Sequence, residues 1–217
     1  MLASQFCRPW RHTSPCTRPV PAKSSITSAC GARTVHTVGH STRTLDEFTA
    51  LLSEAGVQVI ADVRSVPRSR RNPQFNIDLL PASLADSGMR YQHFAELGGR
   101  RHRPRDAPPS PNTFWRNDSF RNYADYAMTD EFATGMARLH DLAVPSNCAI
   151  MCSEALWWRC HRRIISDYLL SQGFAVLHIM GPRQIEAATM TPGANRLPDG
   201  TLVYPAEGSV LNGRLSC

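Results

Sequence analysis

The sequence predicts an α/β fold, a single doubly wound, mainly parallel sheet with helices on both faces. From Thr34 onward, short β-branched or continuously apolar runs alternate with segments of helical periodicity. The apolar runs do not alternate with polar residues, which is typical of strands buried on both faces. Strands that are separated by helices imply right-handed crossovers and therefore a parallel sheet. The 217 residues, 42% hydrophobic and 19% charged, are enough for one such domain with tails.

The elements of the first half follow from their periodicity and their caps. Thr44 and Glu47 form a capping box in front of a helix whose apolar residues share one face, and Gly56 is placed to end it. An arginine-rich loop precedes the next helix. The predicted segments are a strand at 34–38, a helix at 45–55, a strand at 57–63, a loop at 64–76, a helix at 77–87 and a strand at 90–94.

The second half begins with a long loop, residues 97–117, which is rich in proline and arginine. Loops of this length inside a compact domain are usually functional or disordered. Thr129 is placed to cap the second of two helices, and Gly173 to stop the last helix. The predicted segments are helices at 119–128 and 130–142, a strand at 148–152, a helix at 157–172, a strand at 174–180 and at most a hairpin at 197–203.

Composition divides the chain into three parts. Residues 1–33 carry five basic side chains and no acid, and we interpret them as a disordered basic leader. A plain tail or a start codon placed too early is favoured over an organellar transit peptide. Residues 34–181 form the α/β domain, and residues 182–217 form a C-terminal extension. Outside the leader there are 19 basic and 18 acidic side chains, which argues against a general nucleic-acid-binding surface.

The apolar runs and the cysteines indicate the cellular setting. No run approaches the roughly 18 residues that cross a bilayer, so we expect no membrane partner. Cys148, Cys152 and Cys160 lie close together in the sequence, unlike the spaced cysteines of a small secreted disulfide framework. We therefore expect a reducing cytoplasm. The sequence does not predict an oligomeric state.

Polar side chains follow three predicted strands at the point where each strand ends. These segments are Gly39-His40-Ser41, Asp62-Val63-Arg64 and Cys152-Ser153-Glu154. In open α/β sheets, ligands bind outside the carboxyl ends of the strands. We therefore expect a functional site at this edge of the sheet.

Thiol chemistry is the first hypothesis for this site. Cys152 ends a buried strand and faces a loop that opens a helix, where nearby amides lower the pKa of a thiol. Cys160 and His161 are predicted in the first turn of that helix. His161 shares a face with Ile164 and Ile165, so it is either a core histidine or a base aimed at the edge of the sheet. The alternative for Cys152 is a small buried thiol in the core.

The carboxylates and the other polar groups have alternative interpretations. Asp62 and Glu154 either orient a histidine or act as general acid or base, and Asp62 alternatively forms an internal salt bridge to Arg64 or caps a helix. His40 is a second candidate base. Ser41 either hydrogen-bonds a substrate or caps the following helix.

Two arginine-rich loops flank the same edge, at residues 64–71 and 100–105. Guanidinium groups bind phosphates in pairs of hydrogen bonds, and aromatic rings stack on bases. The alternative is a solvated basic surface with some aromatic side chains in the core. The aromatic side chains considered for stacking are Phe94, Phe114, Trp115, Trp157 and Trp158.

These motifs resemble one known family. The residues are Thr37-Val38-Gly39-His40-Ser41, Asp62-Val63-Arg64 followed by Pro67, Leu97-Gly98-Gly99, and Cys152-Ser153-Glu154 followed by Cys160-His161-Arg162. In this order they resemble the family known as domain of unknown function 488. The resemblance implies a bacterial-type α/β domain without an established reaction, and it adds Gly98, Gly99 and Arg162 to the candidate site. Arg159 stands where the family often has a histidine.

We therefore expect a thiol-dependent enzyme that acts on an anionic small molecule or a nucleic-acid-like substrate. Cys152 or Cys160 is the expected thiolate and His161 or His40 the base. Asp62 and Glu154 orient them. Ser41, Arg64, Arg162, Gly98 and Gly99 are the expected substrate-binding residues. No cofactor is expected.

Two alternatives remain open. One is a non-catalytic nucleic-acid-binding module in which the cysteines are structural. The other is a metal-dependent hydrolase with Cys152, Cys160, His161 and His40 as ligands. The gap between Cys152 and Cys160 is too long for the paired spacing of a structural zinc site, which leaves a catalytic three-ligand site.

Overall fold

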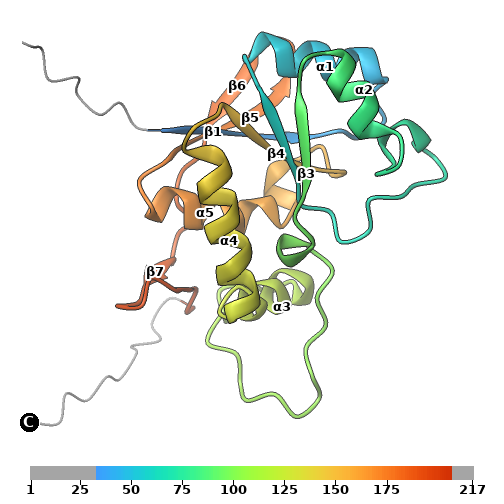
Figure 1. The fold of residues 1–217 in the computed structure, drawn as a ribbon. Coiled ribbons are helices and arrows are strands. Elements are labelled where there is room, and N and C mark those ends of the chain that lie inside the picture. Colours follow the sequence, from blue (N-terminus) through green and yellow to red (C-terminus); the bar gives the residue numbers. More distant parts are fainter. Residues whose placement is uncertain (1–32, 207–217) are drawn as a thin grey trace, which may run out of the picture. The chain divides into compact units, whose positions relative to one another are not determined.

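The computed structural model describes residues 33–206, which form a mixed α/β structure around a six-stranded sheet (Figure 1). The strand order is β3-β2-β4-β1-β5-β6, and all pairs are parallel except β5–β6. The strands of this sheet are β1 (Thr34–Gly39), β2 (Val59–Asp62), β3 (Arg90–His93), β4 (Cys148–Cys152), β5 (Ala175–Gly181) and β6 (Gln184–Ala187). The helices are α1 (Leu45–Glu54), α2 (Leu80–Asp86), α3 (Asp118–Tyr126), α4 (Asp130–Ala143) and α5 (Arg162–Ser171), with short 3₁₀ turns η1 (Pro73–Phe75), η2 (Ala95–Leu97) and η3 (Trp157–Arg159).

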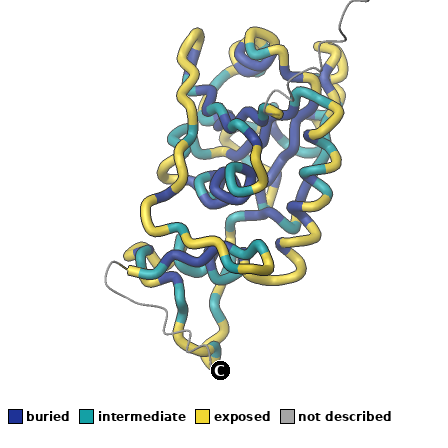
Figure 2. Tube along the Cα trace, turned by 90° about the vertical axis from the view of Figure 1, so that its left-hand side faces the viewer, coloured by how far each residue is buried: buried dark blue, intermediate teal, exposed yellow. Residues whose placement is uncertain are grey.

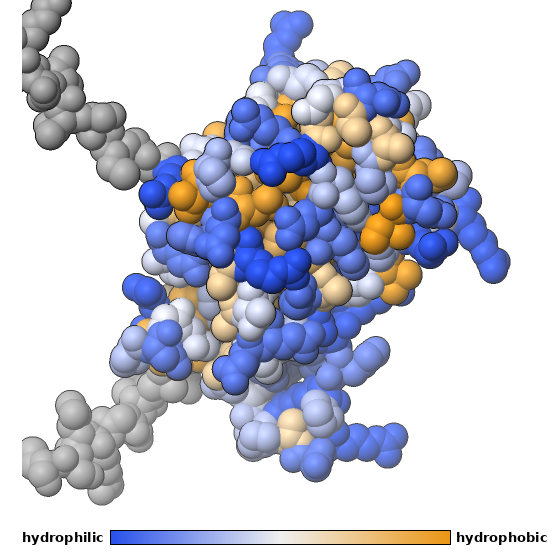
Figure 3. All heavy atoms as spheres, viewed as in Figure 1, coloured by the Kyte–Doolittle hydropathy of each residue, from blue (hydrophilic) through white to orange (hydrophobic). Residues whose placement is uncertain are grey.

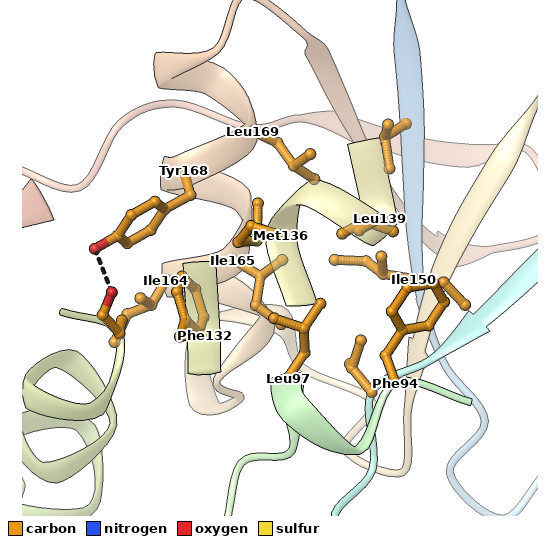
Figure 4. Close-up of a cluster of buried hydrophobic side chains, with 14 of the residues drawn as sticks. Phe94, Leu97, Phe132, Met136, Leu139, Ile150, Ile164, Ile165, Tyr168 and Leu169 are labelled. Carbon is orange, nitrogen blue, oxygen red and sulfur yellow. Dashed lines mark hydrogen bonds between the residues drawn. The ribbon is translucent and has the colours of Figure 1, made fainter. Parts of the chain in front are cut away.

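Alternate residues of the central strands belong to two separate buried clusters, so the sheet is packed on both faces. Side chains of α3, α4 and α5 pack with one set, which includes Val35, Val59 and Ile150. Side chains of α1 and α2 pack with the other. Figure 2 shows the buried residues mainly in the interior of the trace and the exposed residues mainly around them. Figure 4 shows the first cluster, in which the Tyr168 hydroxyl also donates to the carbonyl of Ala127.

The caps and the order of elements confirm the mixed α/β prediction. Thr44 and Glu47 form the expected capping box, and Thr129 caps α4. The doubly wound description stays a prediction, because β6 runs antiparallel to β5 at the edge of the sheet. Sequence periodicity did not indicate β6, whose four residues are all exposed and so lack an apolar pattern.

Two predicted helices start later than expected. The helix expected at 77–87 begins at Leu80, after the 3₁₀ turn η1. The helix expected at 157–172 begins at Arg162, so Cys160 and His161 precede it rather than form its first turn. Cys160 has an extended backbone, with φ −121° and ψ 147°. The Arg162 guanidinium donates to the carbonyls of Glu154 and Ala155, and this contact holds the preceding loop in front of the helix.

The expected C-terminal hairpin is present as β7 (Asn195–Arg196) and β8 (Leu202–Val203), which pair antiparallel. The segment after it packs into the core, because Tyr204 is fully buried and its hydroxyl donates to Asp167. The basic leader, apart from residue 33, and residues 207–217 lie outside the described residues. Between residues 33 and 206, no helix is both long and apolar enough to cross a membrane.

Candidate active site

A cavity of about 790 Å³ lies at the carboxyl ends of β1, β2 and β4. All three polar segments predicted from the strand ends contribute to its lining. Hydrophilic side chains cover most of the face seen in Figure 3, with hydrophobic side chains in separate groups. The predicted site residues that line the cavity are His40, Ser41, Arg64, Gly99, Cys152, Glu154, Cys160 and His161.

The parallel register brings the ends of β1 and β4 together. Gly39 pairs with Cys152, and the ladder continues past the strands with amides of His40 and Ser41 donating to the carbonyls of Cys152 and Ser153 at 2.9 and 3.0 Å. A Cβ atom on Gly39 would lie 2.0 Å from the carbonyl oxygen of Glu154. Only glycine allows this approach, so Gly39 in the Gly39-His40-Ser41 motif is a packing requirement of the site.

The centre of the site is the trio Cys152, Cys160 and His161. His161 Nδ1 lies 3.6 Å from Cys160 Sγ and 4.0 Å from Cys152 Sγ. Its other ring nitrogen, Nε2, lies 2.9 Å from the carbonyl oxygen of Val63. A carbonyl only accepts hydrogen bonds, so Nε2 carries the proton and Nδ1 presents a lone pair to both sulfur atoms.

The two thiols have opposite electrostatic environments. Arg162 Nε donates to Cys160 Sγ at 3.3 Å, just before the first turn of α5. Burial raises the pKa of Cys160, but the hydrogen bond from Cys152 and the charge and hydrogen bonds of Arg162 outweigh it and lower that pKa to about 6. The hydrogen bond to Cys160 and burial raise the pKa of Cys152 to about 12. Cys160 is therefore the more acidic thiol of the pair and loses its proton first.

The loop after η2 forms the wall behind His161. A Cβ on Gly99 would lie 2.3 Å from His161 Nδ1, and a Cβ on Gly98 would lie 2.7 Å from Ser65 Oγ. The ring of Tyr123 meets the His161 ring edge-on, with centroids 5.0 Å apart, and its hydroxyl donates to the carbonyl of Leu97 at 2.8 Å. Gly99 thus contacts the histidine, whereas Gly98 packs on Ser65 and does not line the cavity.

Asp62, Arg64 and His40 form a buried network beside the trio. Both carboxylate oxygens of Asp62 accept from the Arg64 guanidinium, and the Tyr91 hydroxyl donates to Asp62 Oδ2 at 2.6 Å. Asp62 is fully buried and does not line the cavity. Among the roles considered for Asp62, the structure contains the internal salt bridge to Arg64.

His40 is held as a neutral ring by this network. Its Nδ1 donates to the carbonyl of Ser41 at 2.9 Å, and its Nε2 accepts from Arg64 Nη1 at 3.3 Å. Burial and the adjacent Arg64 charge lower the pKa of His40 to about 4. The ring also stacks on Phe75, with centroids 4.1 Å apart. Of the two histidines, His161 is therefore the one with a ring nitrogen that can accept a proton.

Arg162 does not reach the cavity. It is 1% exposed, and its donors are directed to Cys160 Sγ, Thr37 Oγ1 and the carbonyl of Glu154. The side chain of Glu154 lines the cavity and accepts from the amide of Leu156. Ser41 lines the cavity with a positive φ of 52°, and it does not cap α1, because Thr44 does.

Of the further lining residues, Arg100 belongs to the predicted arginine-rich loop 100–105 and Arg159 directly precedes Cys160, whereas Phe120 and Tyr123 were not predicted from the sequence. Arg100 and Arg159 are exposed at the cavity and form no ion pair within residues 33–206. Phe120 and Tyr123 supply its aromatic surface, and their i, i+3 spacing on α3 was the available signal. The aromatic residues considered for stacking lie elsewhere, and the buried Phe94 and Trp115 belong to the core.

The trio also has the composition of a metal site. The ligand atoms of Cys152, Cys160 and His161 all lie within 4.8 Å of one another. His40 is not part of this group, because both of its ring nitrogens are engaged by Ser41 and Arg64.

Comparison with known proteins gives one match. The model of the family described as "Domain of unknown function DUF488" matches residues 44–169, more than half of the chain. No curated protein and no solved structure matches.

Proposed function

The chain belongs to the DUF488 family, and from this premise we propose that it is a thiol-dependent enzyme acting on an anionic substrate. Cys160 is the nucleophile and His161 Nδ1 accepts its proton. The observation that carries the proposal is the alignment of Cys160 Sγ, His161 and the Val63 carbonyl, with 3.6 and 2.9 Å between successive partners. A nucleophile, a base and a group that orients the base are the parts that covalent catalysis requires.

The step follows from these contacts. The Cys160 proton moves to His161 Nδ1, and the resulting thiolate forms a bond to an electrophilic centre of the substrate. The leaving group departs with the bonding electron pair and takes the proton from Nδ1. Hydrogen bonds from Cys152 and Arg162 Nε stabilise the thiolate before attack.

The cavity supports an anionic, nucleotide-like substrate. Arg100 and Arg159 are exposed there without an ion-pair partner in the described part of the chain, and forked guanidinium groups suit phosphates. Phe120, which is partly exposed and stacks on Trp115, offers a ring surface for a base. Arg64 and Arg162 are engaged by protein groups, so their role in this proposal is to position the strand ends.

We further propose that the protein works in a reducing, cytoplasmic setting, which keeps its cysteines as thiols able to react. Cys148, Cys152 and Cys160 are all free thiols. The network of Asp62, Arg64 and His40 acts as a support for the site, because it joins the loops after β1 and β2.

The test is alkylation of the full chain by iodoacetamide at pH 7 after removal of metals with a chelator, with each modified cysteine identified by mass spectrometry. We expect Cys160 to react at least tenfold faster than Cys148, whose pKa is raised to about 12 by burial. AMP should slow the reaction at Cys160. Cys148→Ser is the matched control and should retain the fast phase, and Cys160→Ser should lose it. A fast phase that persists in Cys160→Ser would remove Cys160 as the nucleophile.

A further inference from the structure

We infer that Cys152 Sγ, Cys160 Sγ and His161 Nδ1 bind one zinc ion, whose fourth position faces the cavity. The three atoms converge from two places in the chain, the end of β4 and the residues just before α5. All three residues line the cavity, which leaves room for water or substrate as the fourth ligand. Two cysteines, one histidine and an open position are a known catalytic zinc arrangement.

The spacing of the ligand atoms suits zinc. Zinc–sulfur and zinc–nitrogen bonds of about 2.3 and 2.1 Å in a tetrahedron place sulfur and nitrogen about 3.6 Å apart. His161 Nδ1 lies 3.6 Å from Cys160 Sγ and 4.0 Å from Cys152 Sγ. Closing the longer of these two distances needs a movement of a few tenths of an ångström, and all three ligand atoms lie within 4.8 Å of one another.

The surroundings of the trio are those of a metal ligand set. Histidines that bind metals usually donate their second ring nitrogen to a carbonyl or a carboxylate, which fixes the tautomer. His161 Nε2 donates to the Val63 carbonyl at 2.9 Å, and Gly99 and Tyr123 hold the ring in place. Arg162 Nε donates to Cys160 Sγ at 3.3 Å, and hydrogen bonds of this kind stabilise and orient the thiolate ligands of a metal.

Charge and ligand softness select the ion. Two thiolates neutralise a divalent cation, so the bound centre adds no net charge to the buried end of the sheet. Thiolate and imidazole ligands favour zinc and other thiophilic metals over Mg²⁺ and Ca²⁺, which need oxygen ligands. No carboxylate belongs to this ligand group among the described residues, and the Glu154 side chain on the cavity wall accepts from the Leu156 amide.

Zinc binding and thiol attack use the same sulfur atoms, so each excludes the other. Zinc on Cys160 removes the nucleophile of the proposed function, and only this regulatory consequence rests on that proposal. The binding site itself rests on the ligand geometry.

The test uses the full chain with the cysteines at 7, 16, 30 and 217 changed to serine, so that only the described thiols remain. Zinc affinity is measured at pH 7 by competition with a chromophoric chelator, and Co²⁺ replaces zinc for detection of thiolate-to-metal charge-transfer absorption. We expect one zinc per chain. Cys152→Ser, Cys160→Ser and His161→Gln should each weaken binding by about a hundredfold or more. Cys148→Ser, a buried thiol outside the trio, should bind like the parent chain.

The outcomes separate this inference from the proposed function. Absence of zinc binding, or equal binding by His161→Gln and the parent, overturns the metal site while fast alkylation of Cys160 can still stand. Tight binding together with an unreactive Cys160 in the metal-free chain supports the metal site and removes the thiol enzyme. Zinc protection of Cys160 from iodoacetamide supports the regulatory consequence, and unchanged alkylation in the zinc-bound chain overturns it. Circular dichroism identifies any variant that has lost its fold. Zinc binding by the remaining folded ligand variants then decides whether the trio is the metal site.

Discussion

His161 donates from Nε2 to the carbonyl oxygen of Val63, 2.9 Å away, and this bond determines what the opposite nitrogen can do. Val63 follows β2 and His161 precedes α5, so the bond joins two strand-end segments of the cavity. Because it places the proton on Nε2, Nδ1 is left with a lone pair that faces two sulfur atoms. Both the proposed nucleophile and the proposed zinc site depend on this one tautomer.

Gly99→Ala should displace the His161 ring, because the added Cβ would lie 2.3 Å from Nδ1. We expect the alkylation rate of Cys160 to fall by about tenfold or more, since small misplacements at a reacting centre have large effects. Gly181→Ala is the matched control, with its nearest contact at 3.3 Å to a flexible glutamine side chain. Equal rates in Gly99→Ala and the parent chain would show that His161 does not act on Cys160.

Asp62→Asn should destabilise the fold, because it leaves the buried Arg64 guanidinium without its charge partner. Removing one partner of a buried ion pair costs about 3–5 kcal/mol. The free energy of unfolding in urea measures the effect. Asp78→Asn, which removes an exposed pair with Arg68, is the control and should change stability by less than about 0.5 kcal/mol. A loss of similar size in both variants would contradict the support role of Asp62.

Arg100→Gln and Arg159→Gln should each weaken the protection of Cys160 by AMP. Both guanidinium groups line the cavity without an ion pair inside residues 33–206, so their charge is available to a phosphate. We expect the AMP concentration for half protection to rise by about tenfold for each. Arg70→Gln and Arg71→Gln are exposed controls that do not line the cavity, and they should not change it. If the two control variants raised this concentration as much as the two cavity variants, the effect would be general charge attraction and not a specific anion site.

The free energy of unfolding should fall as the pH is lowered from 6.5 to about 4. Burial, with nearby arginine charge, lowers the pKa of His40 and of His178 to about 4. The unfolded chain therefore binds more protons than the folded chain in this range, and the free energy of unfolding falls as the pH decreases. Each histidine should contribute about 1–3 kcal/mol to this fall. Urea unfolding at pH 7, 5.5 and 4.5 measures it, and His178→Gln should show a shallower pH dependence. An identical slope in the variant would contradict the neutral burial of His178.

The sequence was sufficient for the parts of this protein that short-range chemistry controls. The capping box of Thr44 and Glu47 involves residues three apart, and alternation of strand and helix patterns is visible along the chain. The polar strand ends could be placed at one site because parallel strands end at the same edge. On this basis the sequence predicts that His40, Cys152 and their neighbours share one site, and all three polar segments line the cavity.

The roles of the charged residues were decided by tertiary contacts. Arg162 was expected to hold substrate, but it donates to Thr37, 125 residues away in sequence, and no local pattern reports such a contact. Arg64 was also expected to bind substrate, but its guanidinium is engaged by Asp62 and His40 instead. Arg100 and Arg159 reach the cavity because loops after β3 and β4 converge there.

The sequence by itself determined the α/β class, the edge of the sheet where polar groups collect and the presence of two thiols and a histidine among them. Only the tertiary structure decided which nitrogen of His161 faces the sulfur atoms, which thiol lies beside Arg162, and which arginines remain available at the cavity. The physical reason is how far apart in the sequence the interacting residues lie. Periodicity and caps arise from neighbours within one or two turns, whereas a tautomer, a stabilised thiolate and an ion pair depend on groups that folding brings within about 3–4 Å.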